Sequence, residues 1–293
     1  MPELKQDIWS RWLLDRRFGG DPRRMQTVLE FLNPVRDRVL RHANLGEGQT
    51  LLDVGCGDGL IAFGALEGTK TSRVIFSDIS QDLLTHTRSL AREMHVLDRC
   101  VFLCASADDL SPLPDSSTDA VTASSVLIHV QAKQKAFDEF YRVLGPGGRL
   151  SIFEPINRFA YPEPAHLFDG YDVSPVQALA HKVNAVYLRL QPVETDPMLD
   201  FDERDLLALA EKAGFRKAQL ELQIEIAPCS ENVGWDTFLR IAGNPRIPTL
   251  EEAMREALTP GETESFTTHL RPLVERGKGV RRSAVAYLWA VKS

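Results

Sequence analysis

The chain has 293 residues, of which 43% are hydrophobic and 26% charged, and its formal net charge is −7. This composition is ordinary for a globular protein. The negative charge argues against nucleic acid as a partner, because a phosphate backbone requires a basic binding face. The four cysteines contain no Cys-x-x-Cys pair, so we expect neither a metal site nor a disulfide. With no signal peptide and no apolar run that could span a bilayer, we expect a cytoplasmic protein without a membrane partner.

Two helices are predicted before the first strand. Residues 7–17 have the pattern of a short amphipathic helix. Asp21 and Pro22 then suit the N-cap and the first position of a longer helix, which should end near His42.

The stretch 50–60 combines an apolar run with three glycines spaced two residues apart. This is typical of a buried parallel strand that ends in a tight turn and a helix N-terminus, where the backbone passes close to a ligand. A second apolar strand ends at Asp78, 23 residues after Gly55. A nucleotide-binding αβ unit has its ribose-binding acid at about this distance.

The spacing also helps to distinguish between two cofactors. A dinucleotide fingerprint requires its third glycine one residue later than Gly59, where this chain has Leu60. Asp53 lies two residues before the first glycine, and a carboxylate there suits a cationic ammonium group and repels a pyrophosphate. The pattern therefore favours S-adenosylmethionine over NAD(P).

Several motifs in this order resemble those of the class I S-adenosylmethionine-dependent methyltransferases. They are residues 52–59, Asp78, residues 113–121 and residues 141–150. The resemblance covers roughly residues 45–155, and the spacing is similar to that of the ubiquinone/menaquinone-methyltransferase-like branch, which methylates small molecules. It implies an α/β fold, namely a Rossmann-like, doubly wound sheet of seven mostly parallel strands with the last strand antiparallel.

The resemblance also implies how the chain is organised. Residues 1–44 would form an N-terminal helical lid or cap, and residues 45–156 the cofactor-binding core. Residues 157–200 would be an insertion that builds the substrate pocket. Residues 201–293 would complete the core, with a helical insertion at about 228–280 that covers the site or forms a homodimer surface.

The implied cofactor site lies at the ends of consecutive strands. Asp53 would orient the methionine ammonium, Gly55 and Gly57 would let the backbone approach it, and Asp78 would hold the ribose hydroxyls. The expected cofactor-binding residues are Asp53, Gly55, Cys56, Gly57, Asp78, Ile79, Ser106, Ala107, Asp108, Ser124 and Ser125.

The chain departs from the family pattern at the adenine contact. The family has an acid where this chain has Ser106. Three groups could replace that acid, namely the Ser106 hydroxyl, the Ala107 backbone and the Asp108 carboxylate. Asp108 could equally be a solvated loop residue.

Two side chains are candidates for catalysis because ligands of open α/β sheets bind beyond the carboxyl ends of the strands. His129 follows the fourth strand and could be a general base, a hydrogen-bond donor to the substrate or a helix-start residue. Glu154 ends the fifth strand and could contact the substrate or accept a proton. Alternatively, Glu154 pairs with Arg158 or with an N-terminal arginine.

Substrate contacts are expected from the lid, residues 7–20, and from the first insertion, whereas the second helix of the cap would simply pack on the sheet. Aromatic residues interleaved with prolines in the insertion favour an apolar or aromatic substrate. The candidate substrate residues are Trp12, Arg16, Arg158, Tyr161 and His166.

The second insertion is expected to contain two helices, near residues 235–241 and 250–257. The sixth strand, over residues 217–227, would precede it, and the antiparallel seventh strand, over 283–291, would follow it.

We therefore predict an S-adenosylmethionine-dependent methyltransferase that acts on a small, apolar or aromatic molecule by in-line O-, N- or C-methylation. An NAD(P)-dependent oxidoreductase and a non-catalytic cofactor-binding protein are the alternatives.

Overall fold

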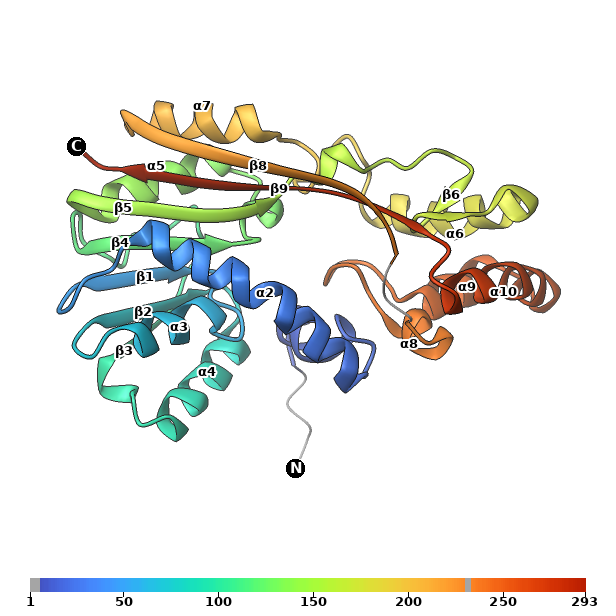
Figure 1. Cartoon of the computed structure of the whole chain (residues 1–293), viewed down its shortest axis with the longest axis horizontal. Helices are drawn as coiled ribbons and strands as arrows, with labels where there is room; N and C mark the ends of the chain where they lie inside the picture. Colours follow the sequence, from blue (N-terminus) through green and yellow to red (C-terminus); the bar gives the residue numbers. More distant parts are fainter. Residues whose placement is uncertain (1–5, 230–232) are drawn as a thin grey trace.

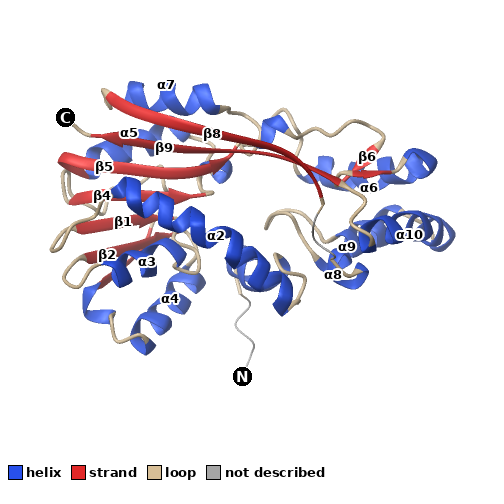
Figure 2. Cartoon of the chain, viewed as in Figure 1, coloured by secondary structure: helices blue, strands red, loops and turns tan. Residues whose placement is uncertain are grey.

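The computed structural model describes residues 6–229 and 233–293. A seven-stranded sheet in the order β3-β2-β1-β4-β5-β9-β8 forms its centre (Figure 1 and Figure 2). The strands are β1 (Thr50–Val54), β2 (Arg73–Asp78), β3 (Cys100–Cys104), β4 (Thr118–Ser124), β5 (Leu144–Pro155), β8 (Lys217–Pro228) and β9 (Val280–Val291). β9 runs antiparallel to β5 and β8, and the other neighbours pair in parallel. The predicted sheet and its antiparallel last strand are confirmed.

Helices cover both faces of this sheet. On one face, α2 (Pro22–Ala43) packs on β5 and α3 (Leu60–Gly68), and α4 (Gln81–Glu93) packs on β2 and β3. On the other face, α5 (Lys133–Val143) packs against α7 (Glu203–Ala213) (Figure 1). Asp21 caps α2, as the sequence predicts, and Asp202 caps α7. The short turns are η2 (Leu97–Arg99), η3 (Leu127–His129), η4 (Asn157–Phe159) and η5 (Ser174–Val176).

The central strands are buried on both faces, which explains their nearly continuous apolar sequences. In β1, Leu51 and Leu52 are fully buried, and Val54 is almost so. The polar exception, Asp53, is also buried and lies opposite Thr122 of β4 in the parallel register. The sheet therefore brings a carboxylate into its core next to the end of β1.

The N-terminal segment comprises α1 (Ile8–Arg11) and the π-helical turn η1 (Trp12–Arg16). Asp7 caps α1, and its backbone N–H donates to Asp82 Oδ2 at 2.7 Å. The Asp7 carboxylate also accepts a hydrogen bond from Ser80 Oγ at 2.6 Å. These bonds fix the segment to the start of α4, next to the carboxyl end of β2.

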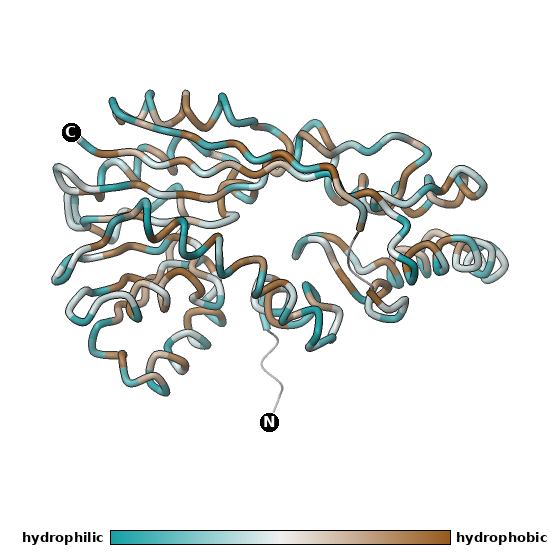
Figure 3. The backbone as a smooth tube through the Cα atoms, viewed as in Figure 1, coloured by the Kyte–Doolittle hydropathy of each residue, from teal (hydrophilic) through white to brown (hydrophobic). Residues whose placement is uncertain are grey.

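A second, smaller body lies at the far end of β8 and β9 (Figure 1), and we call it the helical lobe. It consists of β6 (Leu167–Phe168), β7 (Tyr171–Asp172), α6 (Gln177–Leu190), α8 (Trp235–Arg240), α9 (Leu250–Ala257) and α10 (Pro260–Glu275). Its own hydrophobic core joins Phe168 and Val183 to Trp235, Phe266 and Leu270. Hydrophobic segments accordingly occur in both bodies (Figure 3).

The lobe differs from the sequence-based expectation in two respects. The two insertions, expected as separate units, share one core, because α6 packs against α9 and α10. The third helix, α10, was not predicted. Its start has recognisable signals, since Thr259 and Glu262 form a capping box and Pro260 occupies the first turn.

None of the helices within residues 6–229 and 233–293 has both the length and the hydropathy that crossing a bilayer requires.

Candidate functional site

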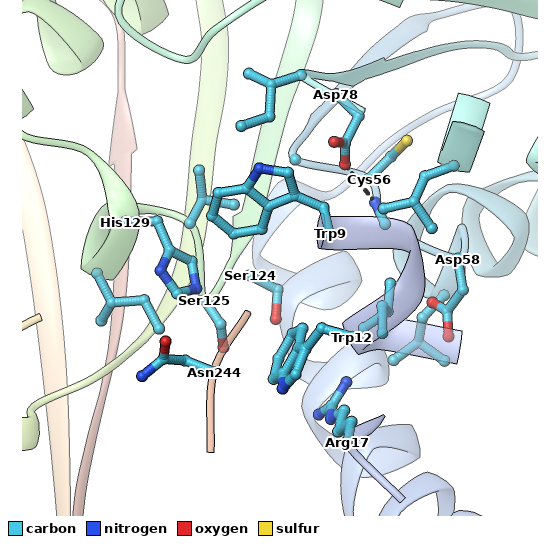
Figure 4. Close-up of a pocket in the computed structure, with 18 of the residues that line it drawn as sticks. Trp9, Trp12, Arg17, Cys56, Asp58, Asp78, Ser124, Ser125, His129 and Asn244 are labelled. Carbon is cyan, nitrogen blue, oxygen red and sulfur yellow. Dashed lines mark hydrogen bonds between the residues drawn. The ribbon is translucent and has the colours of Figure 1, made fainter. Parts of the chain in front are cut away.

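A cavity of about 880 Å³ lies where the carboxyl ends of β1 to β4 meet the N-terminal segment and the helical lobe. The N-terminal segment contributes Trp9, Trp12 and Arg17 to its wall. Figure 4 shows Trp9 between His129 and Asp78, with Trp12 and Arg17 beside each other.

The turn after β1 forms a cradle at the strand end of the cavity. Gly55 and Gly57 have φ angles of 62° and 55°, which side chains other than glycine rarely adopt. A Cβ at Gly55 would lie 2.5 Å from Val126 Cγ2, and one at Gly57 would lie 2.9 Å from Leu13 Cδ2. Both positions therefore need glycine for conformation and for space, and the backbone of the turn stays open to a ligand.

Asp53 supplies a buried carboxylate with one unsatisfied oxygen. Its Oδ1 accepts a hydrogen bond from Thr122 Oγ1 at 2.8 Å, whereas its Oδ2 has no partner among the described residues. Burial raises the pKa of Asp53 to about 7. Because Asp53 lines the cavity and an unpaired buried acceptor is costly, a ligand ammonium group would satisfy this oxygen.

Asp78 lies at the end of β2 on the same edge. Its Oδ2 accepts from the backbone N–H of Gly57 and its Oδ1 from that of Ser80, both at 2.9 Å (Figure 4). Burial raises the pKa of Asp78, and the backbone hydrogen bonds oppose this shift. A carboxylate can accept about four hydrogen bonds, so two remain for ribose hydroxyls.

The end of β3 continues this wall. Ser106 Oγ donates to the Asp108 carboxylate, so the two side chains form one polar unit. Ser106, Ala107 and Asp108 all line the cavity, as does Ile79, whose side chain is 50% exposed. The apolar side chain of Ile79 suits the face of an adenine ring, and the Ser106–Asp108 unit suits its polar edge.

His129 lies in η3, after β4, and its ring faces the cavity together with Ser124 and Ser125. The ring centroid is 4.9 Å from that of Trp9, in an edge-to-face arrangement. Burial lowers the pKa of His129 to about 4, and the positive charges of Arg246 and Lys133 act in the same direction. The imidazole is therefore neutral at pH 7.

Glu154 does not face the cavity, in contrast to the expectation. Its side chain is fully buried, and its carboxylate accepts hydrogen bonds from the backbone N–H groups of Val126 and Leu127 at 2.9 Å and of Ile128 at 3.3 Å. Its partners are thus backbone amides and not Arg158. Burial raises the pKa of Glu154 to about 7. We interpret Glu154 as a positioning residue that holds the turn carrying His129.

Of the five candidate substrate residues, Trp12 lines the cavity and the other four do not. Arg16 forms an ion pair with Glu252 of α9. Arg158, Tyr161 and His166 have exposed side chains on the segment between β5 and β6. The physical reason is that packing of α6 on α9 holds the aromatic start of the first insertion with the lobe. Met198, near the end of that insertion, does line the cavity.

Other residues take the place of these four. Contrary to expectation, the first turns of α2 do not only pack on the sheet but line the cavity through Arg24, Thr27, Val28, Phe31 and Leu32. Met198, Arg281, residues 241–244 and Arg246 complete the wall. Phe31 is a large apolar residue of α2 that the sheet does not bury, since it is 53% exposed. The Gly-Asn-Pro sequence at 243–245 indicates a turn, but no local pattern indicates where that turn lies.

We call residues 241–246 the pocket loop. Trp12 Nε1 donates to the carbonyl oxygen of Ala242 at 2.8 Å, and the Ala242 N–H donates to that of Arg16 at 3.0 Å. Asn244 Nδ2 donates to Gln191 Oε1 at 2.7 Å. The pocket loop is therefore fastened to both the N-terminal segment and the end of α6, and it closes the cavity opposite the strands.

Residues 52–152 match the family model of a methyltransferase domain. The ubiquinone/menaquinone biosynthesis C-methyltransferase UbiE of Escherichia fergusonii is 32% identical over 177 residues, which cover 57% of this chain and 66% of that protein. The chain thus spans slightly less than two thirds of this relative.

Solved structures share the fold at lower identity. Geranyl diphosphate C-methyltransferase from Streptomyces coelicolor A3(2), in complex with Mg²⁺, geranyl diphosphate and S-adenosylhomocysteine, has a TM-score of 0.51 and 18% identity, with 95% of this chain and 88% of that chain covered. The [4+2]-cyclase SpnF also has a TM-score of 0.51, with 21% identity and 89% of this chain and 81% of that chain covered.

Together with the strand-end cradle, these matches show that the chain contains a methyltransferase domain of the class I S-adenosylmethionine-dependent type. Its cofactor is S-adenosylmethionine. The observed site fits this molecule, because the unsatisfied Asp53 oxygen, the Asp78 carboxylate and the Ser106–Asp108 unit follow one another along the cavity in the order of ammonium, ribose and adenine. The described residues contain no cluster of three potential metal ligands.

Proposed function

We propose that the protein transfers the methyl group of S-adenosylmethionine to a small molecule with an apolar or aromatic body. One observation carries this proposal: a single cavity is lined both by the acidic cradle at the strand ends and by the apolar side chains of Trp9, Phe31, Leu32 and Met198. These side chains would give an apolar acceptor contacts beside the cofactor, and the aromatic rings among them would provide flat contact surfaces.

The residues of the chain mainly bind, align and exclude water. Bound S-adenosylmethionine supplies an already activated methyl group, so the main requirement is to hold the acceptor atom in line with it. Asp53 would bind the ammonium group and Asp78 the ribose hydroxyls. The N-terminal segment and the pocket loop would keep water out of the cavity.

His129 is the side chain best placed to handle an acceptor proton. Its neutral imidazole can accept a hydrogen bond from a hydroxyl and so orient the acceptor oxygen, although a pKa of about 4 makes His129 a weak proton acceptor. This role matters for a hydroxyl or carbon-acid acceptor and is dispensable for a free amine or a carboxylate. Glu154 would act through the η3 backbone and would not touch the acceptor.

Calorimetric titration with S-adenosylmethionine, S-adenosylhomocysteine and NAD tests the proposal. Micromolar binding of both sulfur compounds without NAD binding is the expected result, because Asp53 would repel a pyrophosphate. NAD binding alone would instead support an oxidoreductase.

A transfer assay with labelled S-adenosylmethionine and a panel of phenols, aromatic acids and prenylated acceptors tests the chemistry. Cofactor binding without label transfer to any member would favour a non-methylating role. The cyclase SpnF, with the same fold, makes that outcome a specific alternative.

A further inference from the structure

Charge is segregated along the walls of the cavity. The carboxylates in its lining all lie at the carboxyl ends of strands or in the turns after them, and they are Asp53, Asp58, Asp78 and Asp108. The arginines in its lining all come from the N-terminal segment, α2, the pocket loop and β9, and they are Arg17, Arg24, Arg246 and Arg281. The elements other than the strand ends therefore contribute positive charge to the cavity, and one of their arginines, Arg17, meets Asp58 of the acidic wall.

Three of these arginines already have acidic neighbours. Arg17 interacts with Asp58 and stacks on Trp12, with 5.6 Å between its Cζ and the ring centroid. Arg24 interacts electrostatically with Asp169. Arg281 forms an ion pair with Glu225 at 3.1 Å. Their charges are thus at least partly compensated within the protein.

Arg246 differs from the other three. It forms no ion pair with any residue that the structure describes, although it lines the cavity and its side chain is exposed. Its Cζ lies 6.0 Å from the centroid of the Trp9 ring. Its backbone N–H donates to Asn244 Oδ1 at 2.9 Å, and the pocket loop is fastened at Asn244 and Ala242. A fixed loop therefore carries an uncompensated guanidinium group to the acceptor side.

The surroundings of His129 support this view of the local charge. Burial is the main cause of the lowered pKa of His129. The other groups that lower this pKa are the cationic side chains of Arg246 and Lys133. Lys133 is itself compensated by an ion pair with Asp200. The uncompensated positive charge next to His129 and Trp9 is therefore that of Arg246.

We propose that Arg246 binds an anionic group, a carboxylate or a phosphate, on the methyl acceptor while the apolar or aromatic body of that acceptor contacts Trp9. The inference rests on the proposed function and refines its acceptor to an amphipathic anion. A guanidinium group binds such oxyanions through two parallel hydrogen bonds.

A pair of fluorescent probes tests this proposal without a known acceptor. 8-Anilinonaphthalene-1-sulfonate and N-phenyl-1-naphthylamine share one aromatic skeleton, and only the first carries an anion. Both would be titrated into the protein with and without saturating S-adenosylhomocysteine. The proteins compared are the wild type, Arg246→Gln, Arg246→Lys and Arg240→Gln. Arg240 is a matched control because it is exposed on α8 and does not line the cavity.

Arg246→Gln should weaken binding of the sulfonate about tenfold or more, the range for a lost charged hydrogen bond, and leave binding of the neutral probe unchanged. The affinity of Arg246→Lys for the sulfonate should lie between those of the wild type and Arg246→Gln, and Arg240→Gln should bind both probes as the wild type does. Displacement of the sulfonate by benzoate or by phenyl phosphate then shows which oxyanion the site prefers.

Four results would overturn the proposal. Equal weakening of both probes would make Arg246 a structural residue of the pocket loop. An unchanged affinity, or no saturable sulfonate binding to the wild type, would remove the anion site. A parallel loss of S-adenosylhomocysteine affinity in Arg246→Gln, measured by calorimetry, would assign Arg246 to the cofactor. The probe titrations require no methyl transfer, so failure of the proposed function would be recognised separately.

Discussion

The two halves of the cavity are built in different ways. The cofactor half comes from one continuous stretch, residues 53–125, in which each contact follows a strand within a few positions. The acceptor half is assembled from α2, Met198, the pocket loop and Arg281, which are far apart in the sequence. Local patterns therefore determine the first half, whereas the second depends on how the helical lobe packs.

This difference explains what could be predicted. Glycine spacing and strand ends located Asp53 and Asp78 because backbone geometry links these residues directly to the sheet. Glu154 also ends a strand, but its direction depends on β5 pairing with β4, which brings the free amides after Ser124 next to it. Such amides at the start of a turn lack internal partners, and the sequence does not show which carboxylate will meet them.

The acceptor half was largely beyond prediction for a related reason. The aromatic segment near Tyr161 looked like a pocket, but the core shared by Phe168 and Phe266 draws its neighbours to the lobe. The pocket loop has no motif of its own. Its position depends on hydrogen bonds across more than two hundred residues, such as that from Trp12 to Ala242.

The largest expected effect would separate the two halves. Phe266 is fully buried in the lobe and lies edge-to-face against Phe168, with ring centroids 5.6 Å apart. Phe266→Ala should lower the free energy of unfolding by about 3–5 kcal/mol, measured by denaturant titration. Calorimetry should show that S-adenosylhomocysteine binding is largely retained. The exposed Phe159 provides a control, because Phe159→Ala should change stability little. Complete loss of cofactor binding in the folded Phe266→Ala protein would contradict this division.

The reciprocal variant acts on the cofactor half. Asp78→Ala should weaken S-adenosylhomocysteine binding by about 1–3 kcal/mol, because ribose hydroxyls and the Gly57 amide lose their acceptor. Calorimetry measures the affinity, and the fluorescent probes should still bind. Asp98→Ala, in the exposed turn η2, is the control. An unchanged affinity for S-adenosylhomocysteine would remove Asp78 from the cofactor site.

A smaller effect is expected where the halves meet. Trp12→Phe keeps an aromatic ring but removes the hydrogen bond to Ala242, worth about 0.5–1.5 kcal/mol. The KM for the acceptor, or the affinity for the sulfonate probe, should become weaker, with little change for S-adenosylhomocysteine. If the cofactor affinity falls to the same extent, the N-terminal segment closes over both ligands.

The protonation of Asp53 should respond both to folding and to cofactor binding. The pKa of Asp53 rises from an ordinary 3.8 to about 7 in the folded protein. Its contribution to stability is therefore full below pH 3.8 and is lost as the pH rises through about 7. The stability of Asp53→Asn relative to the wild type should accordingly increase over this pH interval.

Cofactor binding should reverse the shift, because an ammonium group favours the carboxylate form of Asp53. At pH 7, binding should release up to about half a proton. Calorimetry in two buffers with different ionisation enthalpies measures this release, which Asp53→Asn should abolish. Release that persists in Asp53→Asn would assign the proton to another group.

The helical lobe is formed by two separate segments of the chain, one after β5 and one between β8 and β9. The elements α7 and β8 lie between these two segments in the sequence. An exchange of this lobe between related enzymes would consequently require the simultaneous replacement of two segments. A chimaera with only one segment replaced would carry Phe168 from one parent and Phe266 from the other, and their packing would no longer match. A change in acceptor preference would then require matched changes in both segments. The start of α2, which also lines the cavity, would have to remain compatible with them.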